Sequence, residues 1–274
     1  MAVKFTILGG VEAWADGERI DLGHARQRCV LVVLLLEANQ VVPTDRLVER
    51  VWGGSAPKSA RSTLYSYLHR LRRSLPAADG ATIARRSGGY ALTVDPDSVD
   101  VHRFTALSER ARAEPDGVRS LALLDEAVAL WRGVAFDEVD SPWLSAVRSH
   151  LDRARLDVEV KRADQALDLG RFTELAATLP ALAHAHPMDE RLAAQLMLAL
   201  HGSGRRVEAL DHYRRFRGRL VGELGIEPGT RLRHVHRYVL AADTESLRPT
   251  VPLSAFTGRL DEADNWEPFR VAPR

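Results

Sequence analysis

The sequence predicts a mainly α-helical protein with a small β part, and three observations support this fold class. Short β-prone runs broken by glycine turns occur in the first 94 residues. From Val101 to about Ala242, apolar residues recur at helical spacing, and glycines and prolines divide this stretch into separate helices. We therefore expect a first domain over residues 1–97, a helical domain over 101–242 and a linker or tail over 243–274.

The first 38 residues predict three short strands and a buried helix. The strands cover residues 3–8, 11–15 and 19–22, and Asp16-Gly17 suits a two-residue hairpin turn. The run from Ala25 to Ala38 is apolar nearly all round, which is typical of a buried helix. It contains Cys29, the only cysteine, so an intramolecular disulfide is excluded and a reducing cytoplasm is favoured.

Two further helices follow in the pattern of a helix-turn-helix. The first begins near Thr44, the expected N-cap, and ends before Gly53-Gly54-Ser55. The second runs from Pro57 to Leu75, because proline suits the first turn of a helix. In such a pair the second helix is the one that enters the major groove of DNA.

The second helix has two chemically different faces. Leu64, Leu68, Leu71 and Leu75 lie on one side, and hydroxyl, imidazole and arginine side chains lie on the other. Lys58 to Arg86 holds seven basic residues against one acid, whereas the whole chain has 38 basic and 37 acidic residues. A charge run alone is usually a solvated helix face, but a local basic patch beside a helix pair favours a nucleic-acid site.

A β-hairpin is expected directly after this helix. Its strands cover Thr82 to Arg86 and Tyr90 to Val94, and Ser87-Gly88-Gly89 forms the turn. A hairpin at this place is the wing of a winged helix-turn-helix. Arg85, Arg86 and Tyr90 could therefore reach a phosphate or the minor groove.

The helical domain contains an internal sequence repeat. The segments LDLGRFTELAATL and LHGSGRRVEALDHY place Gly170-Arg171 and Gly204-Arg205 34 residues apart. This period is typical of tetratricopeptide-like helix pairs that stack on one another.

The order of these blocks resembles a known family. ARQRCVLVVLLLEANQVVPTDRLVERVWG, SARSTLYSYLHRLRRSL and RRSGGYAL resemble the OmpR-type winged helix-turn-helix, with N-terminal strands, three helices and a C-terminal wing. LWRGVAF and AHPMDERLAAQLMLALHGSGRRVEALDHYRRF resemble the bacterial transcriptional activation domain. Together they resemble the Streptomyces antibiotic regulatory protein (SARP) family. The segment VPLSAFTGRLDE is similar to the entrance of the nucleotide-binding domain in larger members, so the chain is either a small member or a fragment.

The helix face and the resemblance together give a set of expected contacts. Base edges are assigned to Ser59, Ser62, Ser66 and His69, and bases or phosphates to Arg61, Tyr65, Arg70, Arg72 and Arg73. Arg85, Arg86, Tyr90 and Thr44 are expected to hold the DNA backbone. The resemblance implies side-by-side dimers on direct repeats in double-stranded promoter DNA, recruitment of RNA polymerase through its sigma subunit, and control of antibiotic biosynthesis. The loop of Gly53, Gly54, Ser55 and Ala56 is the candidate polymerase contact.

Other classes of function have little support in the sequence. We expect no catalytic site, cofactor or metal, because no G-x-S-x-G turn is present and His184 and His186 are two positions apart, on different sides of a helix. No apolar run reaches the roughly 18 residues of a membrane span, so no membrane partner is expected. Two alternatives stay open: a helical-repeat adaptor that binds proteins, and an effector-gated fragment of a larger NTPase-containing regulator.

Overall fold

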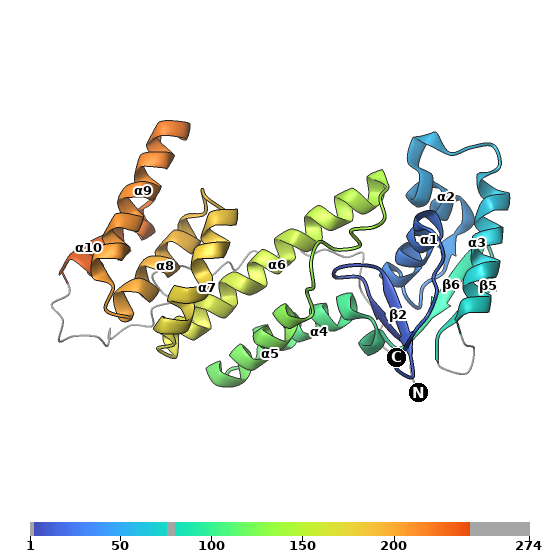
Figure 1. Ribbon diagram of the computed structural model, residues 1–274, viewed down its shortest axis with the longest axis horizontal. Coiled ribbons are helices and arrows are strands. Elements are labelled where there is room, and N and C mark those ends of the chain that lie inside the picture. The colour runs from blue at the N-terminus through green and yellow to red at the C-terminus, as the bar shows by residue number, and fades with distance from the viewer. Residues whose placement is uncertain (1–2, 76–79, 242–274) are drawn as a thin grey trace. The chain divides into compact units, whose positions relative to one another are not determined.

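The computed structural model describes residues 3–75 and 80–241 (Figure 1). The described part divides into two compact units: unit 1 comprises residues 3–110 and 126–156, and unit 2 comprises residues 111–125 and 157–241. The predicted fold class is confirmed, since every described strand lies before residue 94 and helices dominate the rest. The predicted tail over 243–274 lies outside the described residues.

Unit 1 begins with a three-stranded antiparallel sheet. Its strands are β1 (Lys4–Thr6), β2 (Glu12–Ala15) and β3 (Glu18–Arg19), in that order. Asp16 and Gly17 have φ values of 52° and 84°, which is the left-handed turn that matches the twist of a hairpin. The predicted turn and strands are therefore confirmed, although each strand is shorter than its apolar run.

Three helices form the core of the predicted winged helix-turn-helix. They are α1 (Ala25–Leu36), α2 (Thr44–Trp52) and α3 (Ala60–Ser74). Every residue of α1 from Cys29 to Leu36 is buried, as its apolar sequence predicts. The helix ends two residues earlier than expected because Asn39 adopts φ 65° and its side chain bonds the N–H and C=O of Val94, at 3.0 and 2.9 Å.

The starts of α2 and α3 differ from the prediction. Pro43, and not Thr44, is the N-cap of α2, because Thr44 already has helical geometry and its N–H donates to the carbonyl of Gly88 at 3.3 Å. Pro57 lies outside α3, whose N-cap is Ser59. The 3-10 turn η1 (Gly53–Ser55) and an extended Ala56 lengthen the connection, so the second helix begins later than its proline suggests.

A second sheet carries the wing. Its order is β4 (Val42–Pro43), β6 (Gly89–Thr93), β5 (Thr82–Arg86), with both pairs antiparallel. Gly89 lies opposite Pro43, and a Cβ atom there would be 2.1 Å from the carbonyl oxygen of Val42. Only glycine allows this approach, so the predicted Ser-Gly-Gly turn also serves to pair the wing with the strand before α2.

Residues from both sides of the predicted domain boundary pack together in unit 1. After the turn η3 (Pro96–Ser98), the buried carboxylate of Asp100 begins α4 (Asp100–Ala113) and accepts the N–H groups of Ile7 and Leu8 at 2.8 and 2.9 Å. The N–H of Arg132 donates to the carbonyl of Leu8 at 2.8 Å. The first sheet is therefore built on the start of the helical region.

The remaining helices continue to residue 241. They are α5 (Gly117–Ala129), α6 (Pro142–Asp168), α7 (Phe172–Ala185), α8 (Glu190–Gly202), α9 (Arg206–Leu224) and α10 (Thr230–Ala241). Within unit 2, α8 packs against α7, α9 and α10.

The predicted 34-residue repeat is visible in the turns before α7 and α9. Gly170 and Gly204 both have positive φ, and the next N–H in each case returns to the carbonyl five residues earlier, at 2.9 Å for Arg171 and 2.8 Å for Arg205. Each of these arginines then pairs with a glutamate three positions on. The same local sequence therefore produces the same turn twice, as in a tetratricopeptide-like array.

Candidate nucleic-acid interface

Helix α3 has a buried side and an exposed side. Ala60, Leu64, Leu68 and Leu71 are buried in unit 1, which fixes the rotation of the helix. The opposite side carries the side chains that the sequence assigned to bases and phosphates. All of the following are exposed: Ser59, Arg61, Ser62, Tyr65, Ser66, His69, Arg70, Arg72 and Arg73. The structure thus brings the predicted helix residues together on one accessible face.

An aromatic cluster holds α3 against the other two helices. The rings of Tyr67 and Trp52 stack with centroids 6.4 Å apart, and the His24 ring meets Tyr67 edge-on at 4.9 Å. His24 is the N-cap of α1, and Trp52 is the last residue of α2. All three helices therefore contribute to the position of α3.

The wing is attached to the same helix, as Figure 1 shows for α3 beside β5 and β6. The Arg72 Nε donates to the carbonyl of Ile83 at 2.7 Å, and its guanidinium lies 5.3 Å from the centre of the Tyr90 ring. Tyr65 also approaches Tyr90, at 6.3 Å between centroids. Helix and wing thus form one continuous surface.

These contacts change the expected roles of two residues. Tyr90 was expected to touch the DNA backbone, but only 6% of it is exposed, because Tyr65 and Arg72 lie against its ring. Tyr90 therefore packs beneath the exposed surface that Tyr65 and Arg72 form. The Nε of Arg72 already donates a hydrogen bond to the wing, so only the two terminal nitrogens of its guanidinium are left to bind a phosphate.

Arg61 is also less available than its sequence suggested. Its guanidinium forms an exposed ion pair with Asp45 of α2. This acid lies 16 positions earlier in the chain, outside the segment in which the basic balance was counted. A phosphate would have to compete with Asp45 for Arg61.

Of the seven basic residues between Lys58 and Arg86, five remain exposed with neither an ion pair nor a hydrogen bond to the rest of residues 3–75 and 80–241. They are Lys58, Arg70, Arg73, Arg85 and Arg86. Arg70 and Arg73 lie on α3, and Arg85 and Arg86 lie at the end of β5. Unpaired cations along a helix and its wing are the arrangement that phosphate contacts need.

Sequence reasoning missed Arg46. It is exposed in the first turn of α2, and within the described chain it too has no ion-pair partner. The bond between Thr44 and Gly88 places this turn next to the tip of the wing. The sequence did contain a signal for this residue. Arg46 lies just after the predicted start of a helix, and the N-terminus of a helix attracts anions such as phosphate.

The serines of α3 have a defined hydrogen-bond state. Ser62 Oγ donates to the carbonyl of Ser59 at 2.9 Å, and Ser66 Oγ donates to that of Ser62 at 3.2 Å. Their protons are used within the helix, so both hydroxyls present lone pairs outward. They match the amino groups of adenine or cytosine, which are the donors in the major groove.

The loop between α2 and α3 is only partly open. Gly54, Ser55 and Ala56 are exposed. Gly53 has φ 59°, and a Cβ atom there would lie 3.2 Å from Cγ of Pro142, the first residue of α6. The accessible part of the predicted polymerase contact is therefore residues 54–56.

The described residues form neither a metal-ligand cluster nor a membrane-spanning helix. In the part of the chain that the structure describes, no three His, Cys, Asp or Glu side chains group as metal ligands. No described helix is long and apolar enough to cross a bilayer. Cys29 is buried, and this burial raises the pKa of its thiol to about 11.

Two family models match the chain. The C-terminal domain of transcriptional regulatory proteins covers residues 17–92, and the bacterial transcriptional activator domain covers residues 99–240. The chain belongs to the SARP family of bacterial transcriptional regulators.

Relatives of different length support this assignment. The SARP regulator DnrI of Streptomyces peucetius is 37% identical over 267 residues, which cover 92% of this chain and 98% of DnrI. AfsR of Streptomyces griseus is 36% identical over 251 residues, which cover 90% of this chain and 26% of AfsR. The chain thus spans about a quarter of AfsR.

A solved structure shows the same fold. It is Mycobacterium tuberculosis EmbR in complex with a low-affinity phosphopeptide, with a TM-score of 0.81 and 28% identity. The match covers 93% of this chain and 68% of the EmbR chain. DnrI and AfsR are regulatory proteins, and the chain shares their family.

Proposed function

We propose that the protein activates transcription by binding promoter DNA in a sequence-specific way, with α3 in the major groove and the wing on the adjacent backbone. The observation that carries this proposal is the exposed polar face of α3 beside unpaired cations on the helix and the wing tip. The major groove of B-DNA is wide enough to admit an α-helix such as α3, and the wing is attached to this helix through Arg72.

Within this arrangement, hydroxyls read bases and arginines hold phosphates. Ser59, Ser62, Ser66 and His69 lie on the exposed ridge of α3 and are assigned to base edges. Arg70, Arg73, Arg85 and Arg86 are assigned to phosphates, because none of them has an ion-pair partner among the described residues. Arg46 joins this second group, and Thr44 supports it at the start of α2.

We further propose that two copies bind side by side on direct repeats about one helical turn apart. One winged helix covers few base pairs, so a second copy on the same DNA face supplies the missing affinity. The spacing follows from the roughly 10.5 base pairs per turn of B-DNA.

The bound protein recruits RNA polymerase, and its sigma subunit is the proposed partner. Gly54, Ser55 and Ala56 form the exposed loop between α2 and α3, so they protrude next to the DNA-binding helix. The target genes we propose are those of secondary metabolism, including antibiotic biosynthesis, in keeping with the family.

The test is selection of bound duplexes from a random pool by the purified full chain, at low and moderate salt. We expect a tandem repeat with a spacing near one turn, and an affinity that falls steeply with salt. Recovery of no consensus at either salt would overturn sequence-specific binding and favour the protein-binding adaptor.

A further inference from the structure

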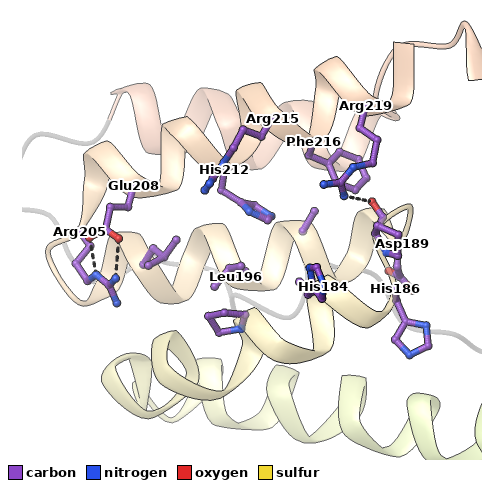
Figure 2. Close-up of a pocket in the computed structure, with 15 residues that line it drawn as sticks. His184, His186, Asp189, Leu196, Arg205, Glu208, His212, Arg215, Phe216 and Arg219 are labelled. Atoms are coloured by element: carbon purple, nitrogen blue, oxygen red, sulfur yellow. Dashed lines mark hydrogen bonds and ion pairs between the residues drawn. The ribbon is translucent and has the colours of Figure 1, made fainter. Parts of the chain in front are cut away.

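Unit 2 contains a cavity of about 390 Å³ between α7, α8 and α9 (Figure 2). Its floor is apolar, with Ala193, Leu196 and Leu200 from α8 and Phe216 from α9. The volume lies in the range of small-molecule sites, which are mostly apolar with a few polar groups. None of the DNA-binding residues above belongs to it.

The polar groups of the cavity come mainly from α9. Figure 2 shows His212 and Arg219 extending from α9 toward the space above α8, and His184 lying on the α7 side. The two acids of the lining are already engaged. Asp189 accepts the N–H groups of Arg191 and Leu192 at 2.8 and 3.0 Å, and Glu208 pairs with Arg205.

Three side chains on α9 have hydrogen-bonding groups that the described residues leave partly or wholly unused. Arg215 is exposed and has no ion-pair partner within residues 3–75 and 80–241. Arg219 makes a single hydrogen bond, to the carbonyl of Pro187 at 3.2 Å. The Nε2 of His212 is buried and lacks a hydrogen-bond partner among the described groups. A buried polar atom without a partner is unusual and points to a missing one.

The charges of the lining limit the ligand. The lining contains Arg205, Arg215 and Arg219 and the acids Asp189 and Glu208, which leaves one surplus positive charge. Burial and the nearby Arg215 and Arg219 lower the pKa of His212 to about 4, so its ring is neutral at pH 7. A singly charged anion therefore fits better than a phosphate dianion. An arginine fork binds a carboxylate with two parallel hydrogen bonds.

We propose that this cavity binds a small molecule with one carboxylate on an apolar body of ring size. Arg215 and Arg219 hold the carboxylate, His212 Nε2 completes its hydrogen bonds, and the body lies on Leu196 and Phe216. The ligand would connect α8 with α9 and lie beside His184 of α7. It is therefore an effector site in unit 2, and its existence does not depend on DNA binding.

The test uses a matched set of probes on the intact chain without DNA. 2-Naphthoate, 2-naphthalenemethanol and 2-naphthylmethylamine share the rings and differ in charge, and acetate has the carboxylate alone. We expect 2-naphthoate to bind with a Kd of about 1 mM in a calorimetric or NMR titration, at least tenfold tighter than the other three. Equal binding of the three naphthalenes would overturn the proposal.

Variants locate the site. Arg215→Gln should weaken 2-naphthoate about tenfold and leave 2-naphthalenemethanol unchanged, because only the carboxylate contact is lost. Arg231→Gln is the matched control, since Arg231 is exposed on α10. The imidazole resonances of His212 and His184 should shift with 2-naphthoate. Unchanged affinity in Arg215→Gln, or unshifted imidazoles, would contradict a site in this cavity.

Discussion

At the scale of single residues, the decisive property is whether a charged side chain has a partner. Arg61 and Arg73 look alike in the sequence, yet Arg61 pairs with Asp45 and Arg73 has no ion pair in the described structure. Local periodicity placed both on the polar face of α3 correctly. It could not show the pairing, because Asp45 lies on another helix. Tyr90 was misjudged for the same reason, since residues of α3 cover it.

Arg73→Ala is expected to weaken DNA binding to all sequences alike. A phosphate contact carries no base information, and its loss should reduce the slope of log affinity against log salt by about one. Titration of a labelled duplex at several salt concentrations measures both. Arg153→Ala, at an exposed position of α6, is the control and should bind like the parent. An altered base preference in Arg73→Ala would refute the phosphate role.

His212 makes the stability of the protein depend on pH. Its pKa is about 4 in the folded state, below the ordinary imidazole pKa of about 6.5, mainly through burial. The folded state thus binds fewer protons, so stability that is present above pH 6.5 is lost as the pH falls toward 4. A shift of this size corresponds to at most about 3–4 kcal/mol. His212→Gln should flatten the decline in urea denaturation between pH 7 and 4.5, and an unchanged decline would exclude this cause.

At the scale of elements, turns were the most predictable features and long-range pairs the least. Asp16-Gly17, Gly88 and the two Gly-Arg turns of the repeat all lie where their sequences predict. Backbone conformation at such positions depends on a few neighbouring residues. The start of α2 was misplaced because the partner of Thr44 is Gly88, on the wing.

Gly89→Ala should loosen the wing. The added Cβ would collide with the carbonyl of Val42, so β4 and β6 must separate. We expect a loss of about 1–3 kcal/mol in the free energy of unfolding and a matching loss of DNA affinity. Ser87→Ala, at the exposed wing tip, is the control for chemical denaturation and should change stability little. Full stability in Gly89→Ala would show that the strand pairing is dispensable.

At the scale of the whole molecule, the first sheet and the helical region are structurally joined. Asp100 accepts hydrogen bonds from residues 92 and 93 positions earlier, which no local pattern reveals. The sequence predicted a domain boundary after residue 97, and it missed the hydrogen bonds that join Ile7 and Leu8 to Asp100 across that boundary. Burial raises the pKa of Asp100, whereas the N–H groups of Leu8 and Ile7 and the charge of Arg132 oppose that rise.

Asp100→Ala should destabilise unit 1 by about 2–4 kcal/mol. It leaves the buried N–H groups of Ile7 and Leu8 without acceptors, which costs more than the bonds themselves contribute. Asp97→Ala, an exposed acid three positions earlier, should be neutral in the same denaturation experiment. Equal stability of the two variants would mean that the sheet is held by its apolar contacts alone.

Cleavage of DNA from a fixed point on α3 measures whether this helix lies in the major groove. Ser66→Cys places a thiol on the exposed face, while the buried Cys29 stays unreactive to an iron chelate. On the selected duplex, the chelate at position 66 should cut within each repeat, and the parent chain treated in the same way should not cut. Binding without cleavage inside the repeats would show that α3 does not lie in the major groove.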